Sequence, residues 1–208
     1  MLLTKLIDLS HELHDGIPVY PGDEEFRLVQ TKSAKRDGYT SFVLNTALHA
    51  GTHLDAPLHF LTEGSMICDL PLETFFGRGC LVDARGEMIV RLRSEHKSMI
   101  RQGDIVLLWT EHSAKYGTDA YYQEHPVLHG EWADFLISMG IKLVGVDLPA
   151  PDNPPFPIHK KLLGAGIPII ENLTKLGDLA GLRSFEVMAF PLRIRAEGSP
   201  VRVVARAT

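Results

Sequence analysis

Residues 131–147, EWADFLISMGIKLVGVD, decide the fold class because they join a helix to a strand. Apolar residues in the first part recur at the i, i+3, i+4 and i+7 spacing of one helix face: Trp132, Phe135, Leu136 and Met139. Gly140 supplies a stop signal, and the aliphatic run 143–146 that follows is typical of a buried strand. A helix that leads directly into a buried strand predicts a domain in which helices pack against a sheet.

Further aliphatic and β-branched runs, each bounded by Gly, Pro or Asp, extend this pattern along the chain. They predict buried strands at Cys80–Val82, Ile105–Thr110, Ile167–Ile170, Phe185–Phe190 and Val201–Val204. A half-buried strand is expected at 40–48, with Phe42 and Leu44 on one face, and a second short helix near Pro157. Strands outnumber helices, so we expect an α/β fold: one domain, 1–208, with a mixed central β core and few helices.

Composition excludes several classes of protein. The 208 residues carry 21 basic and 26 acidic side chains, a net charge of −5, which disfavours a nucleic-acid-binding protein. Two cysteines, Cys68 and Cys80, cannot build a disulfide scaffold, and apolar neighbours favour core packing over a nucleophilic role for each. In residues 1–16, charged and polar residues interrupt the apolar stretch before it reaches the length of a signal peptide. No later apolar run is long enough for a membrane helix. We therefore expect a cytoplasmic protein with no nucleic acid or membrane partner.

The segment HAGTHLDAPLHF, residues 49–60, concentrates three imidazoles and a carboxylate: His49, His53, Asp55 and His59. Gly51 and Pro57 argue against a continuous helix, so a bent path from strand to loop is expected to bring these side chains together. A single histidine is usually an ordinary core or surface residue, and the prediction of a metal site depends on this clustering. Imidazole and carboxylate ligands without nearby thiolates suit Zn²⁺, Mn²⁺ or Fe²⁺ in an open, catalytic site.

Two further residues are candidates, and the remaining histidines are not. His159 follows a Pro-rich turn, and Glu171 ends an apolar run, where a buried carboxylate needs a partner such as a metal ion. A Glu that turns into water at a strand end is the simpler alternative. The other histidines lie in polar surroundings and are expected at the surface, in a solvated loop or at a pocket rim: His11, His14, His96, His112, His125 and His129.

The segment 49–60 resembles the HxGTHxDAPxHF signature of the cyclase family of metal-dependent hydrolases, which includes bacterial kynurenine formamidases (arylformamidases) and isatin hydrolases. The resemblance extends over most of the chain, through Asp8-Leu-Ser, Tyr20-Pro-Gly-Asp23, Gly103-Asp104, Gly145-Val-Asp147 and the pair His159 and Glu171. It implies a swivelling β/β/α fold and a homodimer or larger homo-oligomer.

The resemblance also implies roles for particular residues. His49, His53, Asp55, His159 and Glu171 would hold one or two divalent metal ions, most simply Zn²⁺ with Mn²⁺ as the alternative. His59 would be the catalytic acid and base, with a contact to the second metal left open. Departures limit the substrate assignment: Tyr20 stands where kynurenine formamidases place Trp, Ala150 where the family has Ser, and Glu171 where isatin hydrolases have Gln.

These features predict a metal-dependent hydrolase that cleaves an amide or formamide bond of a small aromatic or cyclic substrate. A metal ion would lower the pKa of water toward neutrality, and His59 would move the proton to the leaving group. Tyr20 and Phe60 are candidate pocket walls, although core packing explains Phe60 equally well. Two alternatives remain open: a metal-dependent cyclase or dehydratase, and a non-enzymatic module that binds metal for stability.

Overall fold

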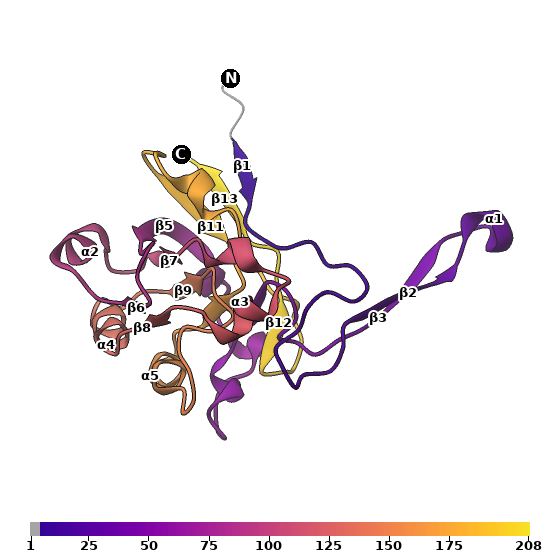
Figure 1. Cartoon of the computed structure of the whole chain (residues 1–208), viewed down its shortest axis with the longest axis horizontal. Coiled ribbons are helices and arrows are strands. Elements are labelled where there is room, and N and C mark those ends of the chain that lie inside the picture. The colour runs from indigo at the N-terminus through magenta and orange to yellow at the C-terminus, as the bar shows by residue number, and fades with distance from the viewer. Residues whose placement is uncertain (1–4) are drawn as a thin grey trace.

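A nine-stranded mixed sheet forms the centre of the computed structural model, which describes residues 5–208 (Figure 1). Residues 1–4 of the N-terminal stretch considered above lie outside the described residues. The spatial order of the strands is β1-β13-β11-β5-β7-β9-β10-β4-β12. Their bounds, in that order, are Leu6–Asp8, Val204–Ala207, Phe185–Met188, Phe76–Asp83, Ile105–Trp109, Leu143–Val146, Ile169–Glu171, His53–Asp55 and Gly198–Pro200.

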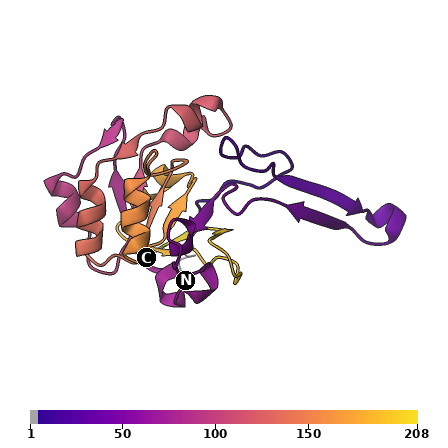
Figure 2. The same cartoon turned by 90° about the horizontal axis from the view of Figure 1, so that it is seen from below.

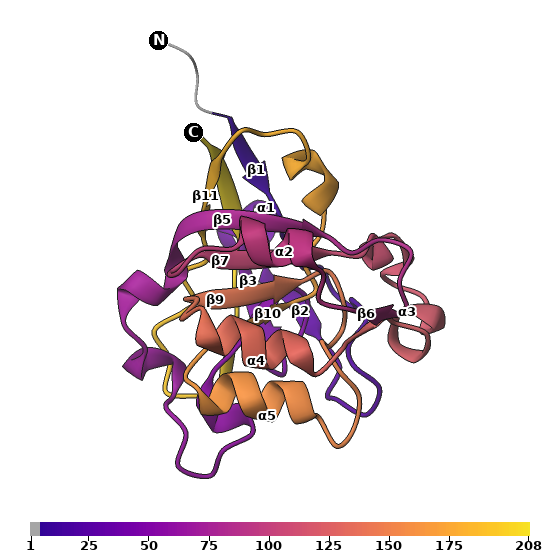
Figure 3. The same ribbon diagram turned by 90° about the vertical axis from the view of Figure 1, so that its left-hand side faces the viewer.

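Four parallel neighbours, β5, β7, β9 and β10, make up the middle of the sheet, and helices cover one of its faces. Figure 3 shows α2 (Ser94–Met99), α4 (Glu131–Ser138) and α5 (Pro157–Gly164) in front of these strands. Alternate strand residues point to opposite faces. Val106 and Leu108 accordingly pack in the same core as Trp132 and Leu136 of α4, as the helix-and-strand pattern of 131–147 predicts.

The other face of the sheet encloses a second core. Ile105 and Leu107 of β7 share it with Leu54 of β4 and Val187 of β11, which belong to opposite halves of the strand order. A flat sheet would keep these strands apart, so the sheet curls to close this core. The single-domain α/β fold with a mixed central sheet and few helices is confirmed.

A two-stranded hairpin, β2 (Arg27–Lys32) and β3 (Ser41–Asn45), extends away from the sheet with the short helix α1 (Ala34–Asp37) at its tip (Figures 1 and 2). The strand predicted at 40–48 is therefore present, but the expected half-burial is wrong. Phe42 and Leu44 do share one face, yet each is more than half exposed.

The remaining elements are short. A second parallel pair, β6 (Ile89–Val90) and β8 (Val127–Leu128), and the helix α3 (Asp119–Gln123) lie in connections. The strand predicted at Val201–Val204 is displaced, because the structure has strands at Gly198–Pro200 and Val204–Ala207, and only Val204 of the predicted strand belongs to one of them. Within residues 5–208, no helix has the length and apolar content needed to cross a bilayer.

Candidate metal centre and substrate pocket

The pairing of β4 with β10 places acidic and imidazole side chains side by side. The two strands are antiparallel, with His53 opposite Glu171 and Asp55 opposite Ile169. His53 and Asp55 are two residues apart and so lie on one face of β4, where a directly opposed partner reaches them. His53 Nε2 is 3.4 Å from Asp55 Oδ1 and 3.3 Å from Glu171 Oε2.

Two more histidines approach this pair of strands from outside the sheet. His49 lies in the turn that precedes β4, and its Nδ1 is 2.8 Å from Asp55 Oδ1. His159 is in the first turn of α5, with Nε2 2.9 Å from Glu171 Oε1 and 3.8 Å from Asp55 Oδ2. The five predicted metal ligands therefore lie together, with three histidines around two carboxylates.

Several polar atoms in this cluster have no hydrogen-bond partner, although water cannot reach them. They are His49 Nε2, His53 Nε2 and both carboxylate oxygens of Asp55. Leaving such atoms buried without partners costs about 1–3 kcal/mol each, and more for a charged group. Nitrogen and oxygen donors without a thiolate fit Zn²⁺ or Mn²⁺, so the donor set matches a divalent cation. The groups His49, Asp55, His59 and His53, Asp55, Glu171 each bring three ligand atoms within 4.8 Å of one another.

Hydrogen bonds orient two of the imidazole rings. The Nδ1–H of His53 donates to the Gly51 carbonyl at 2.9 Å, which leaves Nε2 directed at Asp55 and Glu171. The Nδ1–H of His159 donates to the buried carboxylate of Asp152, which leaves its Nε2 directed at Glu171. A carboxylate or carbonyl that accepts from the far nitrogen is the usual support of a metal-binding histidine.

The carboxylates raise the pKa of these histidines in the metal-free protein. Burial alone would lower the pKa of His53, but the nearby carboxylates of Asp55 and Glu171 raise it to about 10. Burial would also lower the pKa of His159. Asp152 and Glu171 outweigh this effect and raise the pKa of His159 to about 10. The pKa of Asp55 is held well below its ordinary value despite burial, because His49 and His53 lie beside it. At neutral pH, protons on the imidazoles thus take the place of a cation.

His59 differs from its neighbours. It ends the short 3₁₀ helix Pro57–His59 that follows β4, and its ring centroid is 4.1 Å from that of His49 and 6.4 Å from that of His159. Burial lowers the pKa of His59 below the ordinary 6.5. Its imidazole is therefore neutral at pH 7 and can accept a proton.

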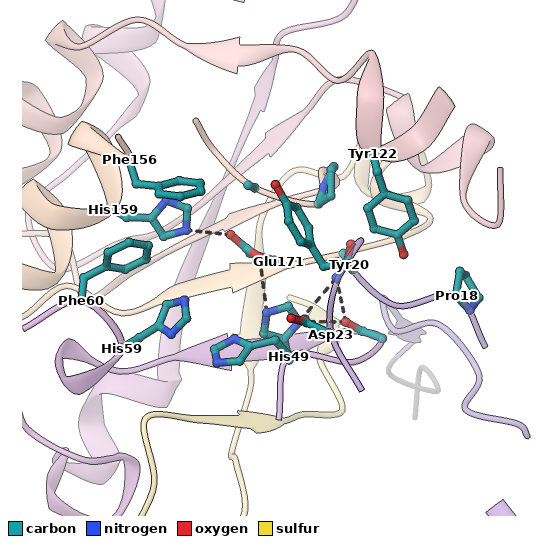
Figure 4. Close-up of a pocket in the computed structure, with 15 residues that line it drawn as sticks. Pro18, Tyr20, Asp23, His49, His59, Phe60, Tyr122, Phe156, His159 and Glu171 are labelled. Carbon is teal, nitrogen blue, oxygen red and sulfur yellow. Dashed lines mark hydrogen bonds and ion pairs between the residues drawn. The ribbon is translucent and has the colours of Figure 1, made fainter. Parts of the chain in front are cut away.

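A cavity of about 240 Å³ opens directly onto the cluster (Figure 4). The predicted wall residues Tyr20 and Phe60 both line it. Phe60 packs near Phe156 and His159 on one side, and Tyr20 meets Tyr122 edge to face, with ring centroids 6.0 Å apart, on the other. Two aromatic walls above a polar floor are suited to a small planar molecule.

Four histidines are less exposed than the sequence analysis expects. His96 is buried against Trp132, His112 is buried against Tyr121, and His125 is buried beside His112. His11 is half-buried and stacks on Tyr116 with a ring-centroid distance of 3.7 Å. Local polarity misled the prediction, because an imidazole ring packs readily on an aromatic face that is distant in sequence.

Asp152 and Asn172 are the supporting residues that the sequence analysis did not identify. Asn172 accepts a hydrogen bond from Tyr121 at 2.8 Å and donates to the Gly51 carbonyl at 2.9 Å, so it braces the backbone beside His53. Its φ of 55° lies in the left-handed region, which asparagine tolerates better than most residues. Two features of the sequence could have indicated these roles. Asn172 directly follows Glu171, and Asp152 is an acidic residue seven positions before His159.

The chain is similar to known proteins in both sequence and structure. The family model described as "Putative cyclase" matches residues 7–153. Kynurenine formamidases of Bacillus thuringiensis (strain Al Hakam) and Bacillus anthracis are each 31% identical over 211 residues, covering 99% of both chains. Isatin hydrolase A from Labrenzia aggregata, bound to benzyl benzoate, superposes with a TM-score of 0.86 at 26% identity, covering 99% of this chain and 94% of that chain.

A further solved structure, described as a potential metal-dependent hydrolase with cyclase activity, gives a TM-score of 0.79 at 26% identity and covers 99% of both chains. The family match spans well over half of the chain, and the relatives align along nearly all of it. On this evidence the chain belongs to the cyclase family.

Proposed function

We propose that this protein hydrolyses the C–N bond of an amide or formamide in a small aromatic or cyclic substrate, as an arylformamidase does. The chain is a metal-dependent hydrolase acting on C–N bonds other than peptide bonds. One observation carries the substrate assignment: the aromatic cavity ends on a cluster of buried imidazoles and carboxylates whose inward atoms lack partners. The relatives named kynurenine formamidase and isatin hydrolase support the same bond type.

The metal is proposed to be Zn²⁺, one or two ions per chain, with Mn²⁺ as the alternative. Its ligands would be His49, His53, Asp55, His159 and Glu171. Imidazole nitrogens outnumber carboxylates in this set, which favours zinc over the purely oxygen-binding cations. Two ions are consistent with the two overlapping groups of three ligand atoms that share Asp55.

When bound, the metal would lower the pKa of water and polarise the scissile carbonyl. The chain supplies the proton transfer. His59 is neutral at pH 7 because burial lowers its pKa, and it lines the cavity beside the cluster. It can therefore take the proton of the attacking water and give it to the leaving nitrogen.

The pocket walls orient the substrate and exclude water. Phe60 and Phe156 on one side, with Tyr20 and Tyr122 on the other, would hold an aromatic ring so that its acyl group points at the polar floor. Positioning of this kind can contribute several kcal/mol to catalysis because the reacting groups no longer need to find each other.

Substrate assays with one substitution test this proposal. Protein loaded with Zn²⁺ or Mn²⁺ is assayed with N-formylkynurenine, isatin and simple aryl formamides. His59→Ala should lower kcat by about 10²- to 10⁴-fold. Metal content is measured in parallel, because His59 belongs to one of the two groups of three ligand atoms. His14→Ala is the matched control, because His14 is exposed and outside the cavity. Full turnover by His59→Ala would remove His59 from the mechanism.

The same assays separate the alternatives. A cyclase or dehydratase would give a product without added water, which mass spectrometry detects. A non-enzymatic metal module would turn over none of the substrates, and chelation would lower its melting temperature without any open coordination position.

Two expectations about the whole protein remain proposals. We propose a homodimer, which sedimentation measures, and a cytoplasmic location, which cell fractionation measures. A small-molecule substrate is the partner that the cavity accommodates.

A further inference from the structure

A tight turn in the cavity wall places an acidic side chain beside an aromatic one. The turn is Tyr20-Pro-Gly-Asp23, in which the backbone N–H of Asp23 donates to the Tyr20 carbonyl at 3.0 Å and Gly22 has a φ of 104°. Pro in the second position and Gly in the third are typical of a type II turn, whose third residue needs a positive φ. The first and last residues of such a turn lie close together, and here both line the cavity.

Tyr122 completes this end of the cavity. It faces Tyr20 across the end that lies away from Phe60 and Phe156 (Figure 4). Burial raises the pKa of Tyr122, and Asp23 is one of the charges that add to this effect. Two tyrosine rings next to a carboxylate attract a cation, because the ring faces carry negative potential and the carboxylate carries a full charge.

No basic side chain balances this carboxylate within the cavity. The lining that residues 5–208 provide includes neither Lys nor Arg, and Asp23 is its one carboxylate outside the candidate metal centre. A positively charged group of a substrate would therefore find a partner at this end. A negatively charged group would find none and would face Asp23, and an unpaired charge of this kind discriminates against a ligand.

One small molecule can reach both Asp23 and the polar floor of the cavity. Burial raises the pKa of Tyr20, and the charges of Glu171 and Asp23 raise it further, so Tyr20 lies within electrostatic reach of both carboxylates. An aromatic ring held between the walls can thus direct its acyl group at the floor and a flexible side chain at Asp23.

We propose that Asp23, with Tyr20 and Tyr122, determines specificity by selecting aromatic substrates whose side chain ends in an ammonium group and carries no carboxylate. This inference rests on the proposed function and narrows it to aromatic amides or formamides with a cationic side chain. Asp23 contacts the side chain of the substrate and not the scissile bond, so its effect is on KM more than on kcat.

Three aryl formamides that differ only in side-chain charge test this specificity. Each is a 2-formamidophenyl ketone, with a propanoyl, a 3-aminopropanoyl or a 3-carboxypropanoyl group. For the wild type loaded with Zn²⁺, kcat/KM for the ammonium compound should exceed that for the neutral compound by about 5- to 30-fold, mainly through KM. The carboxylate compound should fall below the neutral one. Because Asp23 is exposed, the preference should weaken as NaCl rises from about 0.02 to 0.5 M.

Two substitutions in the same segment separate Asp23 from general surface charge. Asp23→Asn removes the charge and keeps the shape, and it should reduce the preference for the ammonium compound about fivefold. Glu24→Gln is the matched control, because Glu24 is an exposed neighbour that does not line the cavity, and it should keep the wild-type preference. Equal kcat/KM values for the ammonium and neutral compounds, or an undiminished preference in Asp23→Asn, would overturn the proposal.

Binding measurements keep this test independent of turnover. Absence of turnover with all three compounds would contradict the proposed function. Calorimetry with the three corresponding anilines, which lack the formyl group, then decides the specificity. The ammonium compound should bind the wild type about 5- to 30-fold more tightly than the neutral one, and Asp23→Asn should lose most of this difference. Equal affinities in the wild type would overturn the role of Asp23.

Discussion

Asp152→Asn is the substitution that most directly tests how the metal centre is supported. Asp152 is buried, and its carboxylate accepts hydrogen bonds from the backbone N–H of Ile158 and from Nδ1 of His159. An asparagine oxygen can still accept from Ile158, but the amide nitrogen then faces His159. The ring proton must move to Nε2, where it occupies the lone pair that is directed at Glu171, 2.9 Å away.

The expected loss follows from this tautomer change. Substitution of a residue that supports a metal ligand weakens metal binding by about 10- to 100-fold. This is about 1.4–2.7 kcal/mol. At a free metal concentration of 100 times the wild-type Kd, metal stabilises the fold by about 2.7 kcal/mol, and a 100-fold weaker site reduces that to about 0.4 kcal/mol.

Competition with a chromogenic chelator measures the Kd for Zn²⁺, and urea unfolding with and without metal measures the stabilisation. Asp178→Asn is the control, since Asp178 is exposed and does not line the cavity. A folded Asp152→Asn protein that binds Zn²⁺ within about twofold of the wild type would refute the reasoning, because such a result is outside the range for a supporting residue.

Three further predictions concern the site and the core. Metal affinity should rise from pH 6 to pH 9 by about tenfold per pH unit for each proton that the metal displaces. The reason is that the metal-free protein holds protons on His53 and His159, whose pKa values are about 10. Calorimetry at several pH values measures this change in affinity. These pKa values lie above the unfolded value of about 6.5. The same ion pairs therefore stabilise the metal-free protein fully below pH 6.5 and cease to do so as the pH approaches 10. A metal-free stability that rises between pH 6.5 and 10 would contradict the raised pKa values of the two histidines. Asn172→Asp should lower the free energy of unfolding by about 1–3 kcal/mol in urea, because a carboxylate oxygen would face the Gly51 carbonyl, and an unchanged value would show that the brace is dispensable. Gly79→Ala should cost at least about 1–3 kcal/mol, because the added Cβ would lie 2.0 Å from Phe185, whereas Gly164→Ala, which meets nothing within 4 Å, should be neutral or stabilising; equal effects would contradict this packing argument.

Much of the fold follows from local patterns. The apolar stripe of Trp132 and Leu136 and the aliphatic runs at 105–110 and 143–146 depend only on side-chain periodicity, so the sequence predicts them. Periodicity does not say what covers an apolar face. Phe42 and Leu44 alternate as in a half-buried strand, yet both side chains are more than half exposed in the described part of the chain.

In the candidate site, too, local sequence patterns predict some residues, and the positions of others depend on the tertiary fold. Clustering within one short segment draws attention to His53 and Asp55, because they are two residues apart on an extended chain. Residues alone suggest Glu171 only weakly, since its position depends on the antiparallel register of β10 against β4. The orienting role of Asp152 was missed because a tight turn, and no regular element, brings it to His159.

The strand order has a consequence for the way this chain folds as it is synthesised. β13, the last strand in the sequence, lies between β1 and β11, and β12 is the outer neighbour of β4. On the ribosome, the outer edge of β4, which carries His53 and Asp55, therefore stays open until residue 200 is made, and β1 stays unpaired until residues 204–207 follow. Such late closure leaves strand edges open on the nascent chain, and open edges can pair with other chains and aggregate.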